Sequence, residues 1–176
     1  ASISANNAWT VVISDNFAYV ADEDKILVVE ISNLNSPVQV GEIQLTNAVK
    51  GLAVDNGFLY AALGSDGVDI YTLNDPGNPQ YLDNYNTTTL ANRLSTFNGK
   101  LAVADWDDVE VLEYDGTSLN LAGHKNTGNR TMGIAAQDNH IYSAEWASVQ
   151  AFEFGKIAGP DIDLSTWELN YPFVEN

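Results

Sequence analysis

The sequence has 176 residues, of which 24 are acidic and 7 basic, so its net charge at pH 7 is −17. A chain of this charge repels nucleic acids and anionic lipids, which argues against both as partners. It has no cysteine, which excludes disulfides, thiol catalysis and zinc–cysteine sites, and no apolar run approaches the roughly 20 residues that a membrane helix needs, so no membrane insertion is expected.

The first segment, residues 1–7, is too short for a domain. It contains an alternating Ser2-Ile3-Ser4 step, which is typical of a strand. We expect it to supply a closing outer strand to the last unit of a ring.

Residues 8–155 contain an internal repeat. A turn followed at once by an apolar run begins at Asn16, Gly57, Gly99 and Asn139, and these four positions are almost evenly spaced. A period in the low forties with several short strands per unit predicts the blades of a β-propeller and argues against helical repeats. The approximate blades are residues 8–47, 48–89, 90–129 and 130–155.

The second repeat shows the strands of a blade most clearly. Its apolar runs Leu52–Val54, Phe58–Ala62 and Val68–Leu73 are separated by turns rich in Asp, Asn and Gly, a pattern of three antiparallel strands. A weaker, more polar fourth strand is expected at 38–45, 80–85 and 119–123. Several strands are apolar at both odd and even positions, which predicts burial on both faces. The fold class is therefore all-β, a β-propeller or partial propeller of three- to four-stranded blades.

The third and outer strands carry a family resemblance. The segments Ile26–Gly41, ILVVEISNLNSPVQVG, and Val68–Pro79, VDIYTLNDPGNP, resemble the LVIVD repeat. The likeness covers residues 8–89 well and the third and fourth repeats only through their first three strands. Members of that family are similar to β-propellers of secreted and cell-surface proteins. The resemblance implies an extracellular or cell-surface location, with the periplasm as an option, and it carries no catalytic residue over.

Residues 156–176 break the repeat pattern. They begin with a Gly-Pro segment and continue into Trp167–Leu169, which is typical of a last strand or of a linker to a following domain. The four repeats either close on themselves or form part of a larger ring, and the sequence leaves both alternatives open.

One edge of the predicted blades gathers the candidate site residues. In propellers the turns after the second strands and the links between blades share one face. The residues expected on it are Trp9, Asp22, Lys50, Asp66, Asn92, Arg93, Asp105, Trp106, Met132, Glu145 and Trp146. Among them, the ligand-binding candidates are Trp9, Lys50, Arg93, Trp106 and Trp146.

The tryptophans Trp106 and Trp146 occupy matching turns of the last two repeats. Two indoles on adjacent blades could form a platform for a sugar ring or for a side chain of a protein partner. The alternative is that each indole caps the apolar groove between two blades.

Acidic side chains offer a weak metal candidate at Asp105, Asp107 and Asp108. Carboxylates are the oxygen ligands that calcium prefers, although the spacing does not match an EF-hand loop. The alternative is a solvated acidic turn. We expect no cofactor, with calcium as the one alternative.

Catalytic signatures are weak. The two histidines, His124 and His140, lie far apart in the repeat, and no Gly-x-Ser-x-Gly motif is present. We therefore expect no enzyme but a non-catalytic binding or assembly module of an exported protein, which presents one propeller face to a protein partner or to the rest of a larger chain. The alternatives are a propeller that binds carbohydrate through its turn tryptophans and a calcium-dependent propeller hydrolase.

Overall fold

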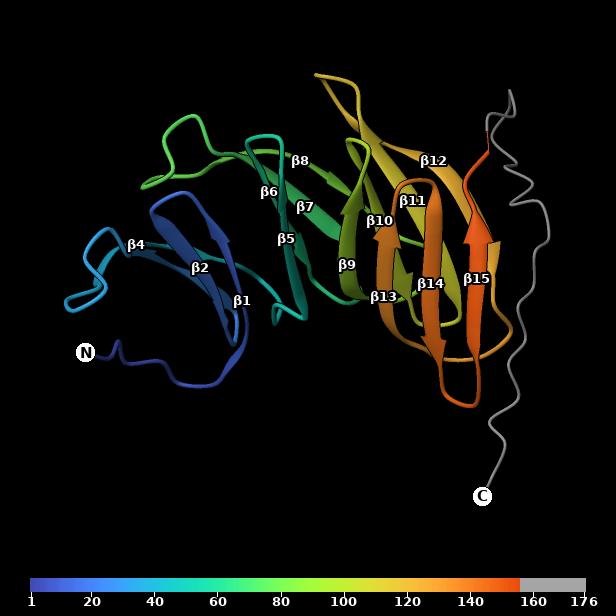
Figure 1. Ribbon diagram of the computed structural model, residues 1–176, viewed down its shortest axis with the longest axis horizontal. Helices are drawn as coiled ribbons and strands as arrows, with labels where there is room; N and C mark the ends of the chain where they lie inside the picture. Colours follow the sequence, from blue (N-terminus) through green and yellow to red (C-terminus); the bar gives the residue numbers. More distant parts are fainter. Residues whose placement is uncertain (156–176) are drawn as a thin grey trace.

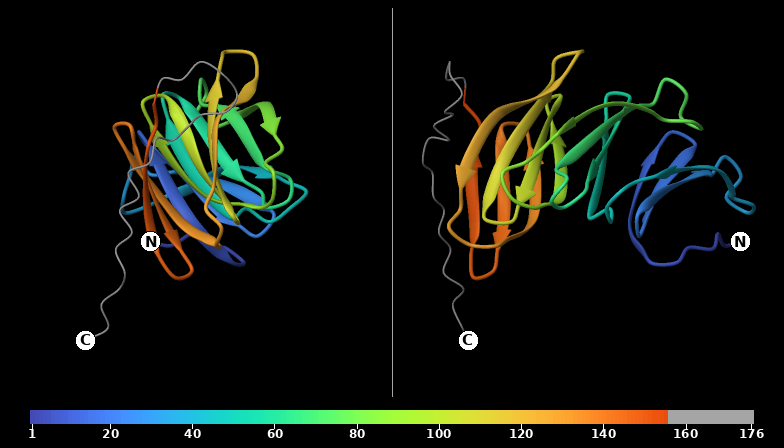
Figure 2. Two further views of the ribbon diagram at one scale, coloured as in Figure 1. Left: turned by 90° about the vertical axis from the view of Figure 1, so that its right-hand side faces the viewer. Right: turned by 180° about the vertical axis from the view of Figure 1, so that it is seen from behind.

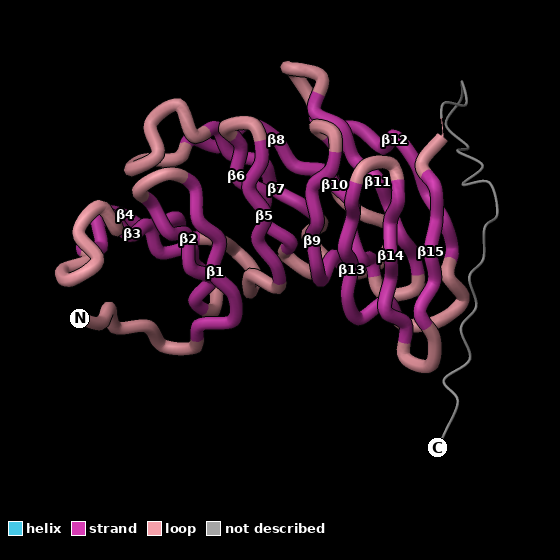
Figure 3. Tube along the Cα trace, viewed as in Figure 1, coloured by secondary structure: helices cyan, strands magenta, loops and turns pink. Residues whose placement is uncertain are grey.

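The computed structural model describes residues 1–155, and this part of the chain contains only strands, turns and loops (Figures 1 and 3). Its strands form four antiparallel sheets, each paired in sequence order. The first sheet comprises β1 (Ala8–Ser14), β2 (Phe17–Asp22), β3 (Lys25–Glu30) and β4 (Val38–Gln44). The second comprises β5 (Gly51–Asp55), β6 (Phe58–Ala62), β7 (Val68–Thr72) and β8 (Gln80–Tyr85). The third comprises β9 (Ala91–Phe97), β10 (Lys100–Asp105), β11 (Asp108–Tyr114) and β12 (Leu119–Asn126), and the fourth β13 (Thr131–Gln137), β14 (His140–Glu145) and β15 (Val149–Glu153). The predicted all-β fold of three- to four-stranded blades is confirmed.

A short turn with positive φ joins the first two strands of each blade. The residue after the first strand has φ of 51° at Asp15, 48° at Asn56, 47° at Asn98 and 55° at Asp138. Asn and Asp tolerate this left-handed conformation better than other residues with a side chain. A tight hairpin of this kind fixes the register of the two strands that it joins.

The four sheets stand side by side as blades of an open arc. The sheet of β1–β4 lies at one end and that of β13–β15 at the other (Figure 1), and the right-hand view in Figure 2 shows the same order from behind. The first strands of neighbouring blades contact each other in turn, β1 with β5, β5 with β9 and β9 with β13. The four blades do not close on themselves, since the end blades that carry β1 and β13 lie at opposite ends of the arc (Figure 1).

The hydrophobic core lies in the seams between blades. Tyr19 and Val28 of the first blade pack with Leu52 and Leu59 of the second, and further apolar clusters fill the second and third seams. Both faces of the two middle blades are therefore buried, as the apolar runs predict.

Gly67 shows how closely the turn after β6 passes the end of β8. Its φ is +74°, and a Cβ atom at this position would clash with the carbonyl oxygen of Tyr85. Only glycine avoids both the unfavourable dihedral and the clash.

Residues 1–7 were expected to form an outer strand of the fourth blade, and the structure places them elsewhere. They pair with no strand of the fourth sheet, and Ile3 packs against the first blade. The backbone amides of Asn6 and Asn7 donate to Oδ1 of Asp22, at 2.8 and 2.6 Å. These two hydrogen bonds hold the segment at the opposite end of the arc.

The interpretation of residues 156–176 as a last strand or a linker concerns a segment outside the described residues. Within residues 1–155 no helix is long and apolar enough to cross a membrane.

Candidate functional site

The antiparallel order of the strands places one end of each blade on a common edge. The first strands begin there, the second strands end there, and the connections at 45–50, 86–90 and 127–130 run along it, on the lower side in Figure 1. We call this surface the link edge. All five predicted ligand-binding residues, Trp9, Lys50, Arg93, Trp106 and Trp146, belong to it.

A break in strand pairing shapes the start of β1, β9 and β13. Trp9, Asn92 and Met132 are each skipped in the pairing of their blade, and Lys50 occupies the same place directly before β5. A bulge of this kind redirects a side chain away from the regular face of a sheet. The four positions therefore present side chains at the link edge without taking part in the core.

The structure brings Trp9, Lys50 and Arg93 together across the first three blades. Nζ of Lys50 lies 6.0 Å from the ring centre of Trp9. Nη1 of Arg93 donates to the carbonyl oxygens of Lys50, at 2.6 Å, and of Asn92, at 2.9 Å. These three residues form one group at the link edge, and a ligand site there stays a prediction.

A second group contains the two turn tryptophans and an arginine that the sequence analysis missed. The guanidinium carbon of Arg130 lies 4.4 Å from the ring centre of Trp106 and 5.8 Å from that of Trp146. Both contacts are within cation–π range. One feature of the sequence could have indicated Arg130: it lies in the link between the two blades whose turns carry the indoles.

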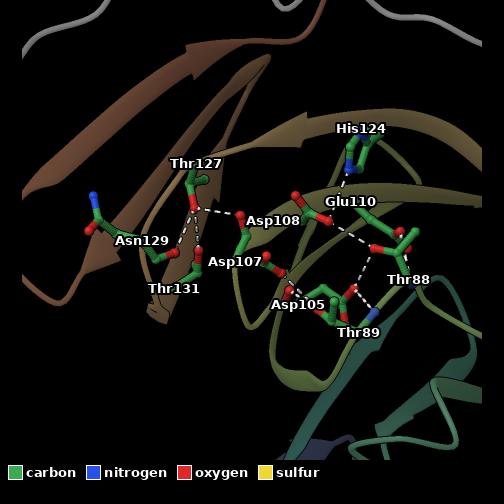
Figure 4. Close-up of polar contacts among 10 residues, drawn as sticks. All are labelled: Thr88, Thr89, Asp105, Asp107, Asp108, Glu110, His124, Thr127, Asn129 and Thr131. Atoms are coloured by element: carbon green, nitrogen blue, oxygen red, sulfur yellow. Dashed lines mark hydrogen bonds and ion pairs between the residues drawn. The ribbon is translucent and has the colours of Figure 1, made fainter.

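Backbone hydrogen bonds fix the three members of this group. The amide of Thr131 donates to the carbonyl oxygen of Trp106, and the amide of Trp146 donates to that of Arg130 at 2.9 Å. The Thr127 hydroxyl lies 2.9 Å from the carbonyl oxygen of Asp107 and 3.1 Å from the Thr131 hydroxyl (Figure 4). The link that carries Arg130 is therefore tied at both ends.

Trp106 has a strained backbone. Its φ is 57°, a conformation that costs a residue with a bulky side chain about 1–2 kcal/mol. Glycine or asparagine would be the ordinary choice for such a turn. The indole is thus placed at the link edge at a cost in stability.

The acidic cluster of the third blade is buried and is not the solvated turn that formed the alternative interpretation. Asp105 and Glu110 are 0% exposed and Asp108 is also buried. The Thr88 hydroxyl lies 3.0 Å from Oδ2 of Asp105 and 2.8 Å from Oδ2 of Asp108 (Figure 4). The amide of Thr89 donates to Oδ2 of Asp105 at 2.8 Å, so the cluster anchors the link at residues 86–90.

Burial and charge perturb Glu110 within this cluster. Desolvation, and next the negative charge of Asp105, raise the pKa of Glu110 to about 7, although the amide of Thr88 and the nearby His124 oppose the shift. Nε2 of His124 lies 3.0 Å from Oδ2 of Asp108. The register of β11 and β12 pairs Glu110 with His124, which brings this histidine to the carboxylates.

The geometry adds no support to a calcium site at Asp105, Asp107 and Asp108. Within residues 1–155, no group of three or more His, Cys, Asp or Glu side chains is arranged so that it could hold a metal ion. Hydroxyl and amide donors of Thr88 and Thr89 already bond to these carboxylates. Calcium binding stays a prediction.

Carboxylates at the ends of second strands have a common structural role. Asp22 and Asp105 accept hydrogen bonds from the segment that leads into the first strand of their own blade, and Glu145 accepts one from the hydroxyl of Thr131, the first residue of β13. In the second blade Leu63 occupies this position, and Asp66 accepts from the Thr46 hydroxyl at 2.9 Å instead. We call the contact between a carboxylate at or after the end of a second strand and the chain that enters the first strand the link latch. It explains why an acidic residue follows the second strand in so many repeats.

Comparison with known proteins agrees with this architecture. Residues 5–44 match the family model described as the LVIVD repeat. No curated protein sequence matches the chain. Among the many solved structures that match, the crystal structure of the computationally designed Ika8 protein has a TM-score of 0.65 and 13% sequence identity, and the match covers 83% of this chain and 45% of that one. The chain therefore spans less than half the length of that relative, and at this identity the likeness concerns the fold alone. The first blade of this chain is therefore similar to the LVIVD repeat, and its four sheets are blades of a partial β-propeller.

Proposed function

We propose that the chain is a non-catalytic binding module of an exported protein and that its link edge binds a protein partner. The observation that carries the proposal is the position of the cations. Within residues 1–155, the ion pairs of Lys25 and Lys100 with carboxylates leave Lys50, Arg93, Lys125 and Arg130 without an acidic partner. All four lie toward the link edge, in a chain whose net charge is −17.

The side chains beside these cations support a protein partner. Trp9, Met132 and Trp146 are exposed at the link edge. Tryptophan, arginine and methionine are enriched in the centres of protein–protein interfaces, where indoles and guanidinium groups contribute most of the binding free energy. A matching partner surface would cover the indoles with apolar groups and place carboxylates at Lys50 and Arg130.

The experiment begins with a photo-crosslinking amino acid at position 146, used with the exported proteins of the source organism. The matched control carries the same amino acid at Tyr81, an exposed residue of the outer strand β8. We expect position 146 to crosslink to one defined protein. Calorimetry with that purified protein should then show affinity at least tenfold weaker for Trp146→Ala and unchanged for Tyr81→Ala. Equal crosslinking at both positions, or equal affinities, would contradict the proposal.

A glycan is the second candidate, because the two indoles flank a guanidinium group. Sugar rings could stack on Trp106 and Trp146 while Arg130 donates to hydroxyl or carboxylate oxygens. On a glycan array, the wild-type chain should bind a defined set of glycans, and Trp106→Ala and Trp146→Ala should abolish that binding. Binding that survives both substitutions would sink this alternative.

A further inference from the structure

Positions that are buried in every seam between blades are exposed at the free face of the fourth blade. The third residue of the second strand faces the following blade. It is 0% exposed at Tyr19 and 5% at Tyr60, but 44% at Tyr142 in the fourth blade. On the neighbouring strand, Val149 is likewise exposed, whereas its counterparts in the first three blades are fully buried.

The first strand of the first blade exposes part of the complementary half of the same seam. The residue of the first strand that packs on the preceding blade is Leu52 in the second blade, where it is 6% exposed. The strand registers place Val11 at the same position of the first blade, and Val11 is 55% exposed. Ile13, two residues further on the same face, is exposed as well.

The two free faces are therefore the two different halves of one interface. The face around Tyr142 corresponds to the side that each inner blade turns to its successor, and the face around Val11 and Ile13 to the side that receives it. A second copy of this chain carries both halves. Two copies can thus form head-to-tail contacts that repeat the packing of the inner seams, and such contacts close into a ring when the rotation permits.

A hydrogen bond of the first seam has a counterpart at this junction. The Tyr19 hydroxyl donates to the carbonyl oxygen of Pro76 in the next blade at 2.9 Å. The turns Ser32–Pro37 and Asn74–Pro79 align on their final prolines, and this alignment places Leu34 where the second blade has Pro76. Leu34 is exposed. Across a junction between copies, Tyr142 would donate to the carbonyl oxygen of Leu34.

The N-terminal segment is compatible with this junction. Ile3 packs on Ala18, Leu27 and Val29, which share the face of Val11 and Ile13. The segment therefore covers the part of the receiving half formed by β2 and β3 and leaves Val11 and Ile13 of β1 open. In the register of the repeat, residues 1–7 correspond to the end of β4 and the start of the following link. Those segments pack in the seam between the first two blades through Ile43 and Leu45.

We propose that a second copy of this chain packs its first blade on the fourth blade of the first copy, and that two copies close one ring through two such junctions. The number of copies follows from the similar solved structure, of which this chain covers 45%, so that two arcs would fill its length. The proposal concerns the end faces of the arc and is independent of partner binding at the link edge.

The test is the mass in solution, measured by light scattering coupled to size exclusion over a range of micromolar concentrations. The wild-type chain should have twice the 19.1 kDa of one copy. Ile13→Asp and Tyr142→Asp each place a charge on one half of the junction, and each should give a single copy. Met132→Asp, at an exposed position of the fourth blade on the link edge, is the matched control and should stay dimeric. Thermal melting followed by circular dichroism checks that each variant is folded.

Mixing the two variants distinguishes head-to-tail contacts from other dimers. Each variant retains the half that the other has lost, so an equimolar mixture should form a heterodimer through one intact junction. A dimer made by two identical faces would survive one of the two substitutions, which would overturn the proposal. A wild-type chain that keeps the mass of one copy would also overturn the proposal, and the end faces would then be assigned to contacts with other blades. Open polymers larger than two copies would exclude the ring of two copies.

Discussion

Glu110 is the residue whose environment differs most from that of an ordinary glutamate. It is fully buried between the link at 86–90 and the strand β12, and its Oε2 has no hydrogen-bond partner within residues 1–155. A buried carboxylate next to another carboxylate favours the protonated form. The raised pKa, about 7 against an ordinary 4.5, therefore reflects a site that holds a neutral acid more easily than a charged one.

The stability of the fold should depend on the protonation of this residue. Between about pH 4.5 and 7 the folded chain retains a proton on Glu110 that the unfolded chain has lost, so stability from this group falls as pH rises through that window. Glu110→Gln should remove this contribution. At pH 8 it should raise the free energy of unfolding by on the order of 3 kcal/mol, because each unit of pKa shift corresponds to about 1.4 kcal/mol.

Urea denaturation at pH 5 and pH 8 checks this expectation. The control is Glu113→Gln on the same strand, where the half-exposed carboxylate pairs with Lys100. Its effect should be small at both pH values. If Glu110→Gln has the same effect at pH 5 as at pH 8, Glu110 does not titrate in this window.

The residue scale also shows why sequence analysis missed parts of the site. Glu110 alternates with Val109 and Val111, and this pattern correctly predicts a strand. Its burial depends on Thr88, which is distant in the sequence and belongs to the link. Arg130 was missed for the same reason, since its contact with the two indoles requires the packing of adjacent blades. The tryptophans were found because the repeat itself places them at matching turns.

At the scale of the structural elements, the link latch connects each blade to the segment that enters it. The first latch is the clearest, because one carboxylate oxygen of Asp22 accepts two backbone amides. Replacing Asp22 by Ala leaves both amides without this partner. We expect Asp22→Ala to lower the free energy of unfolding by about 1–3 kcal/mol.

The matched control for the latch is Asp24→Ala. Asp24 lies two residues away in an exposed turn, and the hydrogen bonds that it accepts in this turn go to its backbone carbonyl oxygen, which the substitution retains. Its effect should stay within about 0.5 kcal/mol. Thermal or chemical denaturation of the two variants measures the difference, and equal destabilisation would show that the Asp22 side chain does not fasten residues 6–7.

Elements were predictable where a local pattern determines them. The run Phe58–Ala62 has the bounds of β6, because turn residues enclose it on both sides. The skipped residues Trp9, Asn92 and Met132 were not predictable as bulges, since a single unpaired residue does not change an apolar pattern. The position of residues 1–7 was also predicted wrongly, because their alternating pattern says nothing about which blade they join.

At the scale of the whole molecule, the excess of negative charge lowers the stability of the folded state. The net charge of −17 is distributed over a small fold, and mutual repulsion of carboxylates destabilises it. Sodium chloride shortens the range of this repulsion, with a Debye length of about 30 Å at 0.01 M and about 3 Å at 1 M. The melting temperature at pH 7.5 should therefore rise by several degrees as salt increases through this range.

The control is to measure the same salt dependence at a second pH. At pH 4.1, the isoelectric point of the sequence, the net charge vanishes and most of the salt dependence should disappear. Differential scanning calorimetry at both pH values gives the comparison. An equal increase at both would mean that salt acts on apolar hydration rather than on charge.

The open arc was one of two alternatives that the sequence left open. Repeat period and strand pattern determine the kind of blade, but ring closure depends on the rotation between blades, which small differences in seam packing set. Those differences are distributed over many side chains, so no single motif reports them.

The bulge at the start of β1, β9 and β13 lets the residue at the link edge vary independently of the residues that pack the blades. Blade packing constrains the strand residues that follow it, whereas the skipped residue itself is free to be an indole at position 9, an amide at position 92 or a thioether at position 132. Evolution, or a protein engineer, can therefore exchange the chemistry of the link edge one blade at a time while the scaffold keeps its stability.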